Sequence, residues 1–306
     1  MEHLQRRLEA LEQQMHTVNH RLRWWRGLAC GLAVVGLLGW GLPLGLARED
    51  PADKEKGEKG LAQRVAALEQ LLKHFSREGN EIFITGANLH IVNSLGRTDC
   101  GTEEEPIPDC PNGLGNLIVG YNELRNDPNF SDVRTGSHNV VVGQQHNFSR
   151  FGGLVVGFFN EISGDFASVS GGEVSVASGN RSSVSGGTNN KASGDFTSVS
   201  GGGSNTASGL AAVVSGGSGN TASGERSVVS GGVENTASGD FATVSGGLTN
   251  TASGERAAAV SGGAGNTASG SFAVVSGGRN ITQEAEAGWS AGSEADEVVV
   301  GNFRSP

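Results

Sequence analysis

Few side chains in this sequence combine into patterns that do chemistry, and the clearest pattern is a pair of cysteines. Cys100 and Cys110 flank the nine-residue loop GTEEEPIPD, a spacing that matches neither a CxxC redox motif nor a zinc ligand pair. In an oxidising compartment we expect them to form a disulfide that closes the loop, with metal binding as the weaker alternative. His138 and His146, each followed by Asn, are interpreted as turn residues rather than metal ligands.

The residue types needed for hydrolysis are not arranged in a catalytic pattern. Glycoside hydrolysis uses two carboxyl groups at a fixed separation, and no Asp/Glu pair recurs in this chain in that way. The numerous Gly-Gly pairs also lack the aspartates of calcium-binding nonapeptide repeats. We therefore expect a protein that is not an enzyme and that needs no cofactor or metal.

Binding chemistry is better represented, in a column of aromatic and cationic residues. The second residue after each Ser-Gly pair reads Phe166, Arg181, Phe196, Ala211, Arg226, Phe241, Arg256 and Phe272. If the repeats stack at the spacing of β-strands, neighbouring Phe and Arg side chains come close enough for cation–π contacts. The column forms either a binding surface or the seam between associated chains.

Two further columns are polar, because the motif Asn-Thr-Ala-Ser recurs. Its asparagines are expected to stack into a ladder that serves the turns: Asn205, Asn220, Asn235, Asn250 and Asn266. Beside them the hydroxyl residues define a flat polar face: Thr206/Ser208, Thr221/Ser223, Thr236/Ser238, Thr251/Ser253 and Thr267/Ser269. Regular rows of hydroxyls are what lattice matching requires, so an ice- or crystal-binding protein is an alternative function.

These columns exist because one short sequence motif repeats through the chain. The valine of each VSGG recurs at Val169, Val184, Val199, Val214, Val229, Val244, Val260 and Val275, spaced by 15 residues with a single 16. Such a period predicts a solenoid, and these valines are its expected core. We interpret each period as one coil of a parallel β-roll, with the Gly-Gly and Ser-Gly pairs supplying positive φ at the turns.

The repeat resembles the head repeat of the trimeric autotransporter adhesins, the YadA-like heads, whose coils carry a Ser-Val, a Gly and a downstream Ala-x-Gly at a similar period. The resemblance covers roughly residues 114–301. It implies a left-handed parallel β-roll, a homotrimer, and adhesion to a glycan or matrix protein. The family's C-terminal outer-membrane strands have no counterpart before Pro306, so the resemblance does not extend to self-export.

The N-terminal region predicts a helix and a membrane anchor. Residues 1–26 carry a seam spaced 4-3-4-3-4: Leu4, Leu8, Leu11, Met15, Val18 and Leu22. This predicts a coiled-coil helix, or alternatively an amphipathic helix on a membrane surface. Residues 27–47 are 21 uncharged, mostly apolar residues, long enough to span a bilayer. A signal peptide cleaved after Ala47 is the alternative.

The charges beside the membrane span predict its orientation, and the residue pattern predicts the structure of the two segments that follow it. Arg21, Arg23 and Arg26 face only Arg48 across the span, which favours a cytoplasmic N-terminus, an inner-membrane location and a periplasmic or extracellular head. Residues 48–60 are charged and contain Pro and Gly, so they predict a flexible linker. Residues 61–78 predict a coiled-coil neck with a heptad seam: Leu61, Val65, Leu68, Leu72 and Phe75.

The rest of the chain divides around the repeats. Residues 79–135 predict a β cap that includes strands at Ile82–Ile84 and Leu89–Val92, the disulfide loop, and an insertion at 121–135. Residues 136–279 form the β-roll head, and 280–306 a C-terminal cap.

Composition argues against an ordinary globular protein and against a nucleic-acid binder. The net charge is −10 and Gly occupies 50 of 306 positions, so no basic surface for nucleic acid is expected. We expect a membrane-anchored homotrimer that presents its head for adhesion. The alternatives are the ice- or crystal-binding solenoid and a polysaccharide-acting enzyme on a β-helix.

Overall fold

The computed structural model describes residues 51–101, 110–126, 128, 131–292 and 299–302. These residues belong to two units, one ending at Asn88 and the other beginning at Leu89, and each is described by itself. The expected coiled coil at 1–26 and the membrane span at 27–47, with its orientation, lie outside the described residues. In the ranges above, no helix is both long and apolar enough to cross a membrane.

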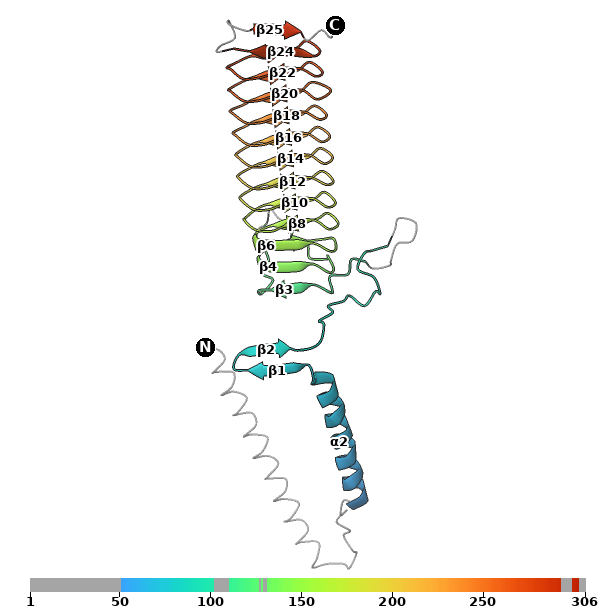
Figure 1. Cartoon of the computed structure of the whole chain (residues 1–306). Helices are drawn as coiled ribbons and strands as arrows, with labels where there is room; N and C mark the ends of the chain where they lie inside the picture. The colour runs from blue at the N-terminus through green and yellow to red at the C-terminus, as the bar shows by residue number, and fades with distance from the viewer. Residues whose placement is uncertain (1–50, 102–109, 127, 129–130, 293–298, 303–306) are drawn as a thin grey trace, which may run out of the picture. The chain divides into compact units, whose positions relative to one another are not determined.

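The first unit contains a helix followed by a hairpin (Figure 1). The helix α2 spans Pro51–Leu72, and β1 (Phe75–Glu78) pairs antiparallel with β2 (Glu81–Ile84). Two bonds extend the ladder: the Thr85 N–H donates to the His74 carbonyl at 2.8 Å, and His74 Nδ1 donates to the Thr85 carbonyl at 2.9 Å.

The start of α2 corrects the expected linker at 48–60. Its Pro and Gly content predicts a flexible segment, but the helix already begins at Pro51. Proline is favoured in the first turn of a helix, and the Lys and Glu residues that follow are good helix formers. These preferences offset the cost of two helical glycines, about 1 kcal/mol each relative to alanine.

The end of α2 corrects the expected neck at 61–78. The helix stops at Leu72, so Phe75 lies in a strand and not on the heptad seam. Gly79 has φ +56° and sits in a two-residue turn, which lets the apolar runs on its two sides pair as strands.

The second unit is a parallel β-solenoid of about ten turns, with coils of about 15 residues, between residues 140 and 290 (Figure 1). Two strand columns run along it, and each strand pairs with its equivalent one coil away. The first sheet contains β3 (Leu117–Val119), β4 (Val140–Gln144), β6 (Leu154–Phe158), β8 (Ser168–Val169), β10 (Ser183–Val184), β12 (Ser198–Val199), β14 (Val213–Val214), β16 (Val228–Val229), β18 (Thr243–Val244), β20 (Ala259–Val260), β22 (Val274–Val275), β24 (Gly288–Ala291) and β25 (Val299–Asn302). The second contains β5 (Asn147–Phe148), β7 (Glu161–Ile162), β9 (Val176–Ala177), β11 (Lys191–Ala192), β13 (Thr206–Ala207), β15 (Thr221–Ala222), β17 (Thr236–Ala237), β19 (Thr251–Ala252), β21 (Thr267–Ala268) and β23 (Thr282–Gln283).

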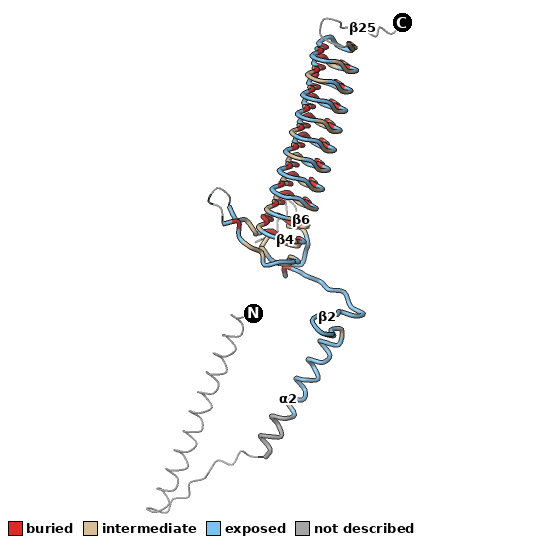
Figure 2. The backbone as a smooth tube through the Cα atoms, turned by 90° about the vertical axis from the view of Figure 1, so that its left-hand side faces the viewer, coloured by how far each residue is buried: buried red, intermediate tan, exposed pale blue. Residues whose placement is uncertain are grey.

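The core lies between the two sheets, and Figure 2 shows the buried residues following one another along the solenoid. The predicted core is confirmed, because every valine of the VSGG motif is buried: Val169, Val184, Val199, Val214, Val229, Val244, Val260 and Val275. Buried alanines fill the second sheet: Ala177, Ala192, Ala207, Ala222, Ala237, Ala252 and Ala268. Phe148 and Ile162 take the alanine place in the first coils.

Two glycines per coil let neighbouring coils approach at the corners. The second glycine of each VSGG motif has positive φ, +84° at Gly202, and a Cβ there would overlap the Gly217 carbonyl oxygen. In the Ser-Gly pair that follows the second strand of each coil, the glycine has no positive φ, contrary to expectation. At Gly209 a Cβ would instead overlap the Gly224 carbonyl oxygen, so this glycine serves close approach. The positive φ falls two residues later, +54° at Ala211.

The predicted asparagine ladder is confirmed and is longer than the sequence motif suggests. Its members are Asn160, Asn190, Asn205, Asn220, Asn235, Asn250 and Asn266, all buried. Asn220 Nδ2 donates to the carbonyls of Gly216 (2.9 Å) and Gly232 (3.0 Å), and its Oδ1 accepts the Asn235 N–H at 2.9 Å. Ser175 substitutes in one coil, where its Oγ accepts the Asn190 N–H at 3.2 Å. Each amide thus ties its own coil to the next one.

The insertion covers the first coils. The Phe148 N–H donates to the Val133 carbonyl at 2.9 Å, so the insertion pairs with β5 at the edge of the second sheet. The buried Arg125 guanidinium donates to the Gln145 carbonyl and to the Asn160 carbonyl, both at 3.1 Å. The expected strand at Leu89–Val92 does not form, because this run pairs with no strand of the described chain. At the other end β25 pairs antiparallel with β24.

Replacing Val214 with Asp tests the inward assignment. The change buries a carboxylate without a partner between Val199 and Val229, so we expect a loss of about 3–5 kcal/mol in unfolding free energy. Thr221→Asp, on the outer face of the neighbouring strand, should cost less than about 0.5 kcal/mol. Thermal unfolding followed by circular dichroism measures both, and equal melting temperatures would show that the assignment is wrong.

Candidate functional site

The aromatic and cationic column lies at a corner of the solenoid, on residues with positive φ. They are Phe166, Arg181, Phe196, Ala211, Arg226, Phe241, Ala257 and Phe272, with φ between +47° and +59°. Each N–H bonds back to the previous coil, as Arg181 does to the Asp165 carbonyl at 2.7 Å. The corner turns the side chains away from the core, and the Phe166 and Phe196 residues are 45% and 53% exposed. We call this column the ridge.

Arg256 was predicted as a member of this column, but it does not belong to the ridge. The coil between Val244 and Val260 has 16 residues, and the additional one lies in this corner. The Arg256 backbone forms a parallel β-bridge with Asp240. Ala257 has the positive φ and occupies the ridge position. Counting from the Ser-Gly pair could not show this, because the additional residue falls between that pair and the ridge.

Cation–π contacts connect neighbouring members of the ridge. The Arg181 guanidinium lies 5.7 Å from the Phe166 ring centroid and 5.4 Å from that of Phe196. Arg226 lies 5.4 Å from the Phe241 ring. Phe151 extends the cluster with an edge-to-face contact to Phe166 at 5.1 Å. The contacts hold exposed aromatic faces in fixed positions, a geometry that suits binding rather than catalysis.

Carboxylates beside the ridge are engaged by neighbouring groups. Arg150 forms a bidentate pair with Asp165, with distances of 2.6 and 3.1 Å. Asp195 accepts the Asn180 N–H at 2.8 Å, and Glu225 pairs with Arg226 at 2.7 Å. Across the part of the chain that the structure describes, no group of three or more His, Cys, Asp or Glu side chains could hold a metal ion.

The predicted hydroxyl face is real but has a limited length. The threonines stand in parallel register at Thr206, Thr221, Thr236, Thr251, Thr267 and Thr282. In the preceding coils the same outward position holds Glu161, Val176 and Lys191, which interrupt the row.

One serine has the spacing of a nucleophile motif, Gly-x-Ser-x-Gly at 288–292, but not its structure. A nucleophile elbow places its serine on a sharp turn between a strand and a helix. Ser290 lies inside β24, is fully buried, and accepts a bond from Gln283 Nε2 at 2.7 Å. It therefore belongs to the packing at the end of the solenoid.

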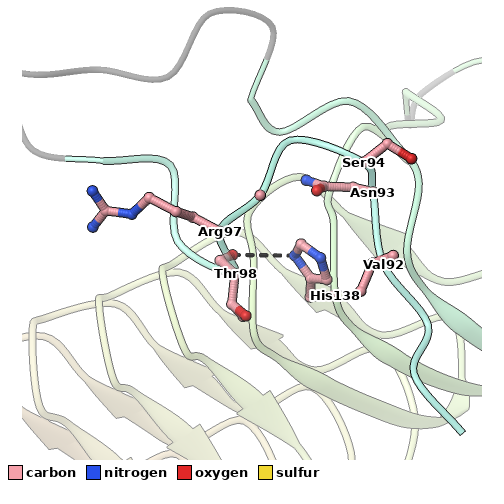
Figure 3. Close-up of a pocket in the computed structure, with 7 residues that line it drawn as sticks. Val92, Asn93, Ser94, Arg97, Thr98 and His138 are labelled. Carbon is pink, nitrogen blue, oxygen red and sulfur yellow. Dashed lines mark hydrogen bonds between the residues drawn. The ribbon is translucent and has the colours of Figure 1, made fainter.

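A cleft lies near the start of the second unit (Figure 3). It is lined by Val92, Asn93, Ser94, Gly96, Arg97, Thr98 and His138. His138 has φ +56° and is a turn residue as expected, and its Nδ1 donates to the Thr98 carbonyl at 3.1 Å. The expected disulfide between Cys100 and Cys110 follows the lining residues 92–98 along the chain, and its Cα atoms are 5.2 Å apart. The other residues of the cleft belong to no repeated pattern, so they could not be predicted from the sequence.

His146 proves to be the first member of the asparagine ladder. It is buried, its Nδ1 accepts the Asn160 N–H at 3.2 Å, and its Nε2 donates to the Val142 carbonyl at 3.0 Å. This is the neutral imidazole, with the bonds that Asn makes in later coils. Burial lowers the pKa of His146 below its usual value.

Comparison with known proteins adds no family to this description. No protein-family model matches the chain, and no curated protein is significantly similar to it.

The lowered pKa of His146 predicts acid sensitivity. The unfolded chain binds a proton near pH 6.5 and the folded chain only at lower pH, so stability is fully present above about 6.5 and is lost as the pH falls toward the folded pKa. The slope is at most about 1.4 kcal/mol per pH unit. His146→Asn should remove this component while continuing the ladder. Urea unfolding of both proteins at neutral and mildly acidic pH measures it, and parallel profiles would contradict the prediction.

Proposed function

We propose that the chain is a non-enzymatic, membrane-anchored homotrimer that presents its solenoid at a cell surface for adhesion to a glycan or matrix protein. The observation that carries this proposal is the ridge, a row of exposed aromatic rings and guanidinium groups on a regular scaffold. Aromatic faces stack on the C–H faces of sugars and on apolar protein groups, while guanidinium groups donate to hydroxyl and carboxylate oxygens.

The spacing of the ridge supports an extended ligand. Phe166 and Phe196 are two coils apart, which is roughly 9–10 Å at the spacing of β-strands, with Arg181 between them. A chain of sugar residues or an extended peptide can contact both rings at once. A ligand of one sugar residue can contact only one of them.

The exposed seam of α2 supports self-association. Leu61, Val65, Leu68 and Leu72 are 44–59% exposed, although they share a heptad pattern that buries such residues in coiled coils. Three copies of α2 packed along this seam would cover them. The resemblance to trimeric adhesin heads is the basis for the number three and for left-handed winding.

The remaining parts of the proposal rest on the sequence. Residues 27–47 would anchor the chain in the inner membrane with a cytoplasmic N-terminus, which leaves the head on the periplasmic or extracellular side. The hydroxyl face keeps lattice binding as the weaker alternative, because Lys191 and Glu161 break the row that lattice matching needs. The third candidate, a polysaccharide-acting enzyme, gains no support from the engaged carboxylates beside the ridge.

The proposal is tested with the full chain in detergent on arrays of glycans and matrix proteins. Phe166→Ala combined with Phe196→Ala should lower retention of the bound component by about tenfold or more, since stacking contacts contribute about 0.5–1.5 kcal/mol each beyond buried area. Thr221→Ala, on a different face, is the matched control and should bind normally.

Light scattering on the same samples measures the assembly, with the detergent mass subtracted. The expected mass is three times 31.3 kDa, and Leu68→Asp should reduce it by placing a charge on the seam. A single-chain mass, or retention that does not differ between the ridge variant and the control, would refute the proposal.

A further inference from the structure

The cleft beside His138 contains a buried donor without a partner. Asn93 is 3% exposed; its Oδ1 accepts the Leu95 N–H at 3.0 Å, and its backbone carbonyl accepts Asn112 Nδ2 at 3.2 Å. Its own Nδ2 has no hydrogen-bond partner among the described residues. An unsatisfied buried donor costs about 1–3 kcal/mol, so a ligand that accepts from it is favoured.

An acceptor lies across the cleft from this donor. His138 Nδ1 donates to the Thr98 carbonyl, so in the neutral ring Nε2 carries no hydrogen and accepts. Figure 3 shows the Asn93 amide and the His138 ring facing the same space, with Val92 beside them. The cavity volume of about 420 Å³ falls within the range of small-molecule sites, roughly 300–1,000 Å³.

The charged side chain at this cleft is directed elsewhere. Figure 3 shows the Arg97 guanidinium pointing away from Asn93 and His138, and it pairs with Asp99 at 2.8 Å. A carboxylate or phosphate would therefore accept from Asn93 but meet the lone pair of His138 Nε2. A hydroxyl group satisfies both, because it accepts from one neighbour and donates to another.

We propose that this cleft binds one monosaccharide unit, through a hydroxyl that accepts from Asn93 Nδ2 and donates to His138 Nε2. The apolar face of the sugar ring lies against the Val92 methyl groups and the His138 ring. The site goes beyond the function proposed above, since it requires neither the ridge nor the trimer. It is a second, separate binding site on the head.

Saturation-transfer NMR on the full chain tests this site, in a zwitterionic detergent without a sugar head group. The probes are methyl α-D-glucopyranoside, methyl α-D-mannopyranoside, methyl β-D-galactopyranoside and N-acetylglucosamine at millimolar concentration. At least one should bind saturably. Asn93→Asp keeps the oxygen that accepts the Leu95 N–H but removes the donor, so it should weaken binding about tenfold or more.

His138→Phe should have a similar effect, and Phe is compatible with the backbone because Phe166 adopts the same positive φ. Thr221→Ala is the control, since Thr221 lies on the second sheet and not among the residues that line the cleft, and it should bind like the parent chain. The absence of saturable binding for all four sugars would overturn the proposal. So would unchanged binding in Asn93→Asp, or displacement of the sugar by equimolar sulfate. Ridge variants should leave the signal unchanged, which separates this result from a failure of the adhesion proposal.

Discussion

The solenoid depends on the hydrogen bonds of one buried side chain per coil, an asparagine except in the coils of His146 and Ser175. Turns at the corners leave backbone carbonyls inside the molecule, and Asn Nδ2 satisfies one carbonyl of its own coil and one of the next. Its Oδ1 then fixes the N–H of the following asparagine. These hydrogen bonds require that neighbouring coils lie at β-strand spacing at every corner. The glycines that face carbonyl oxygens, such as Gly202 and Gly209, permit this close approach.

The same constraint explains why the surface is free to vary. With mostly valines, alanines and asparagines inside, each coil is stable only against its neighbours, and outward positions carry little of the packing. The ridge can therefore alternate Phe, Arg and Ala at one backbone conformation. Binding chemistry and folding are thus carried by different columns of one repeat.

Much of this could be predicted because a strict period converts spacing into geometry. The valine core and the asparagine ladder follow directly, and the disulfide pair follows from its loop. Prediction failed where the pattern changes: the additional residue moves Arg256 off the ridge, and Phe75 satisfies both a heptad and a strand pattern. The Asn93 cleft is formed by segments outside the repeat, so only their folded contacts reveal it.

The most direct test of this account is the unfolding free energy of Asn235→Leu, with Thr236→Ala as its neighbour control. Leucine has the same branching at Cγ but cannot bond the Gly231 and Gly247 carbonyls or the Asn250 N–H. The account predicts a loss of about 3 kcal/mol or more, with faster amide exchange in the coils on both sides. If Asn235→Leu were as stable as Thr236→Ala, the ladder would not be what holds the coils together.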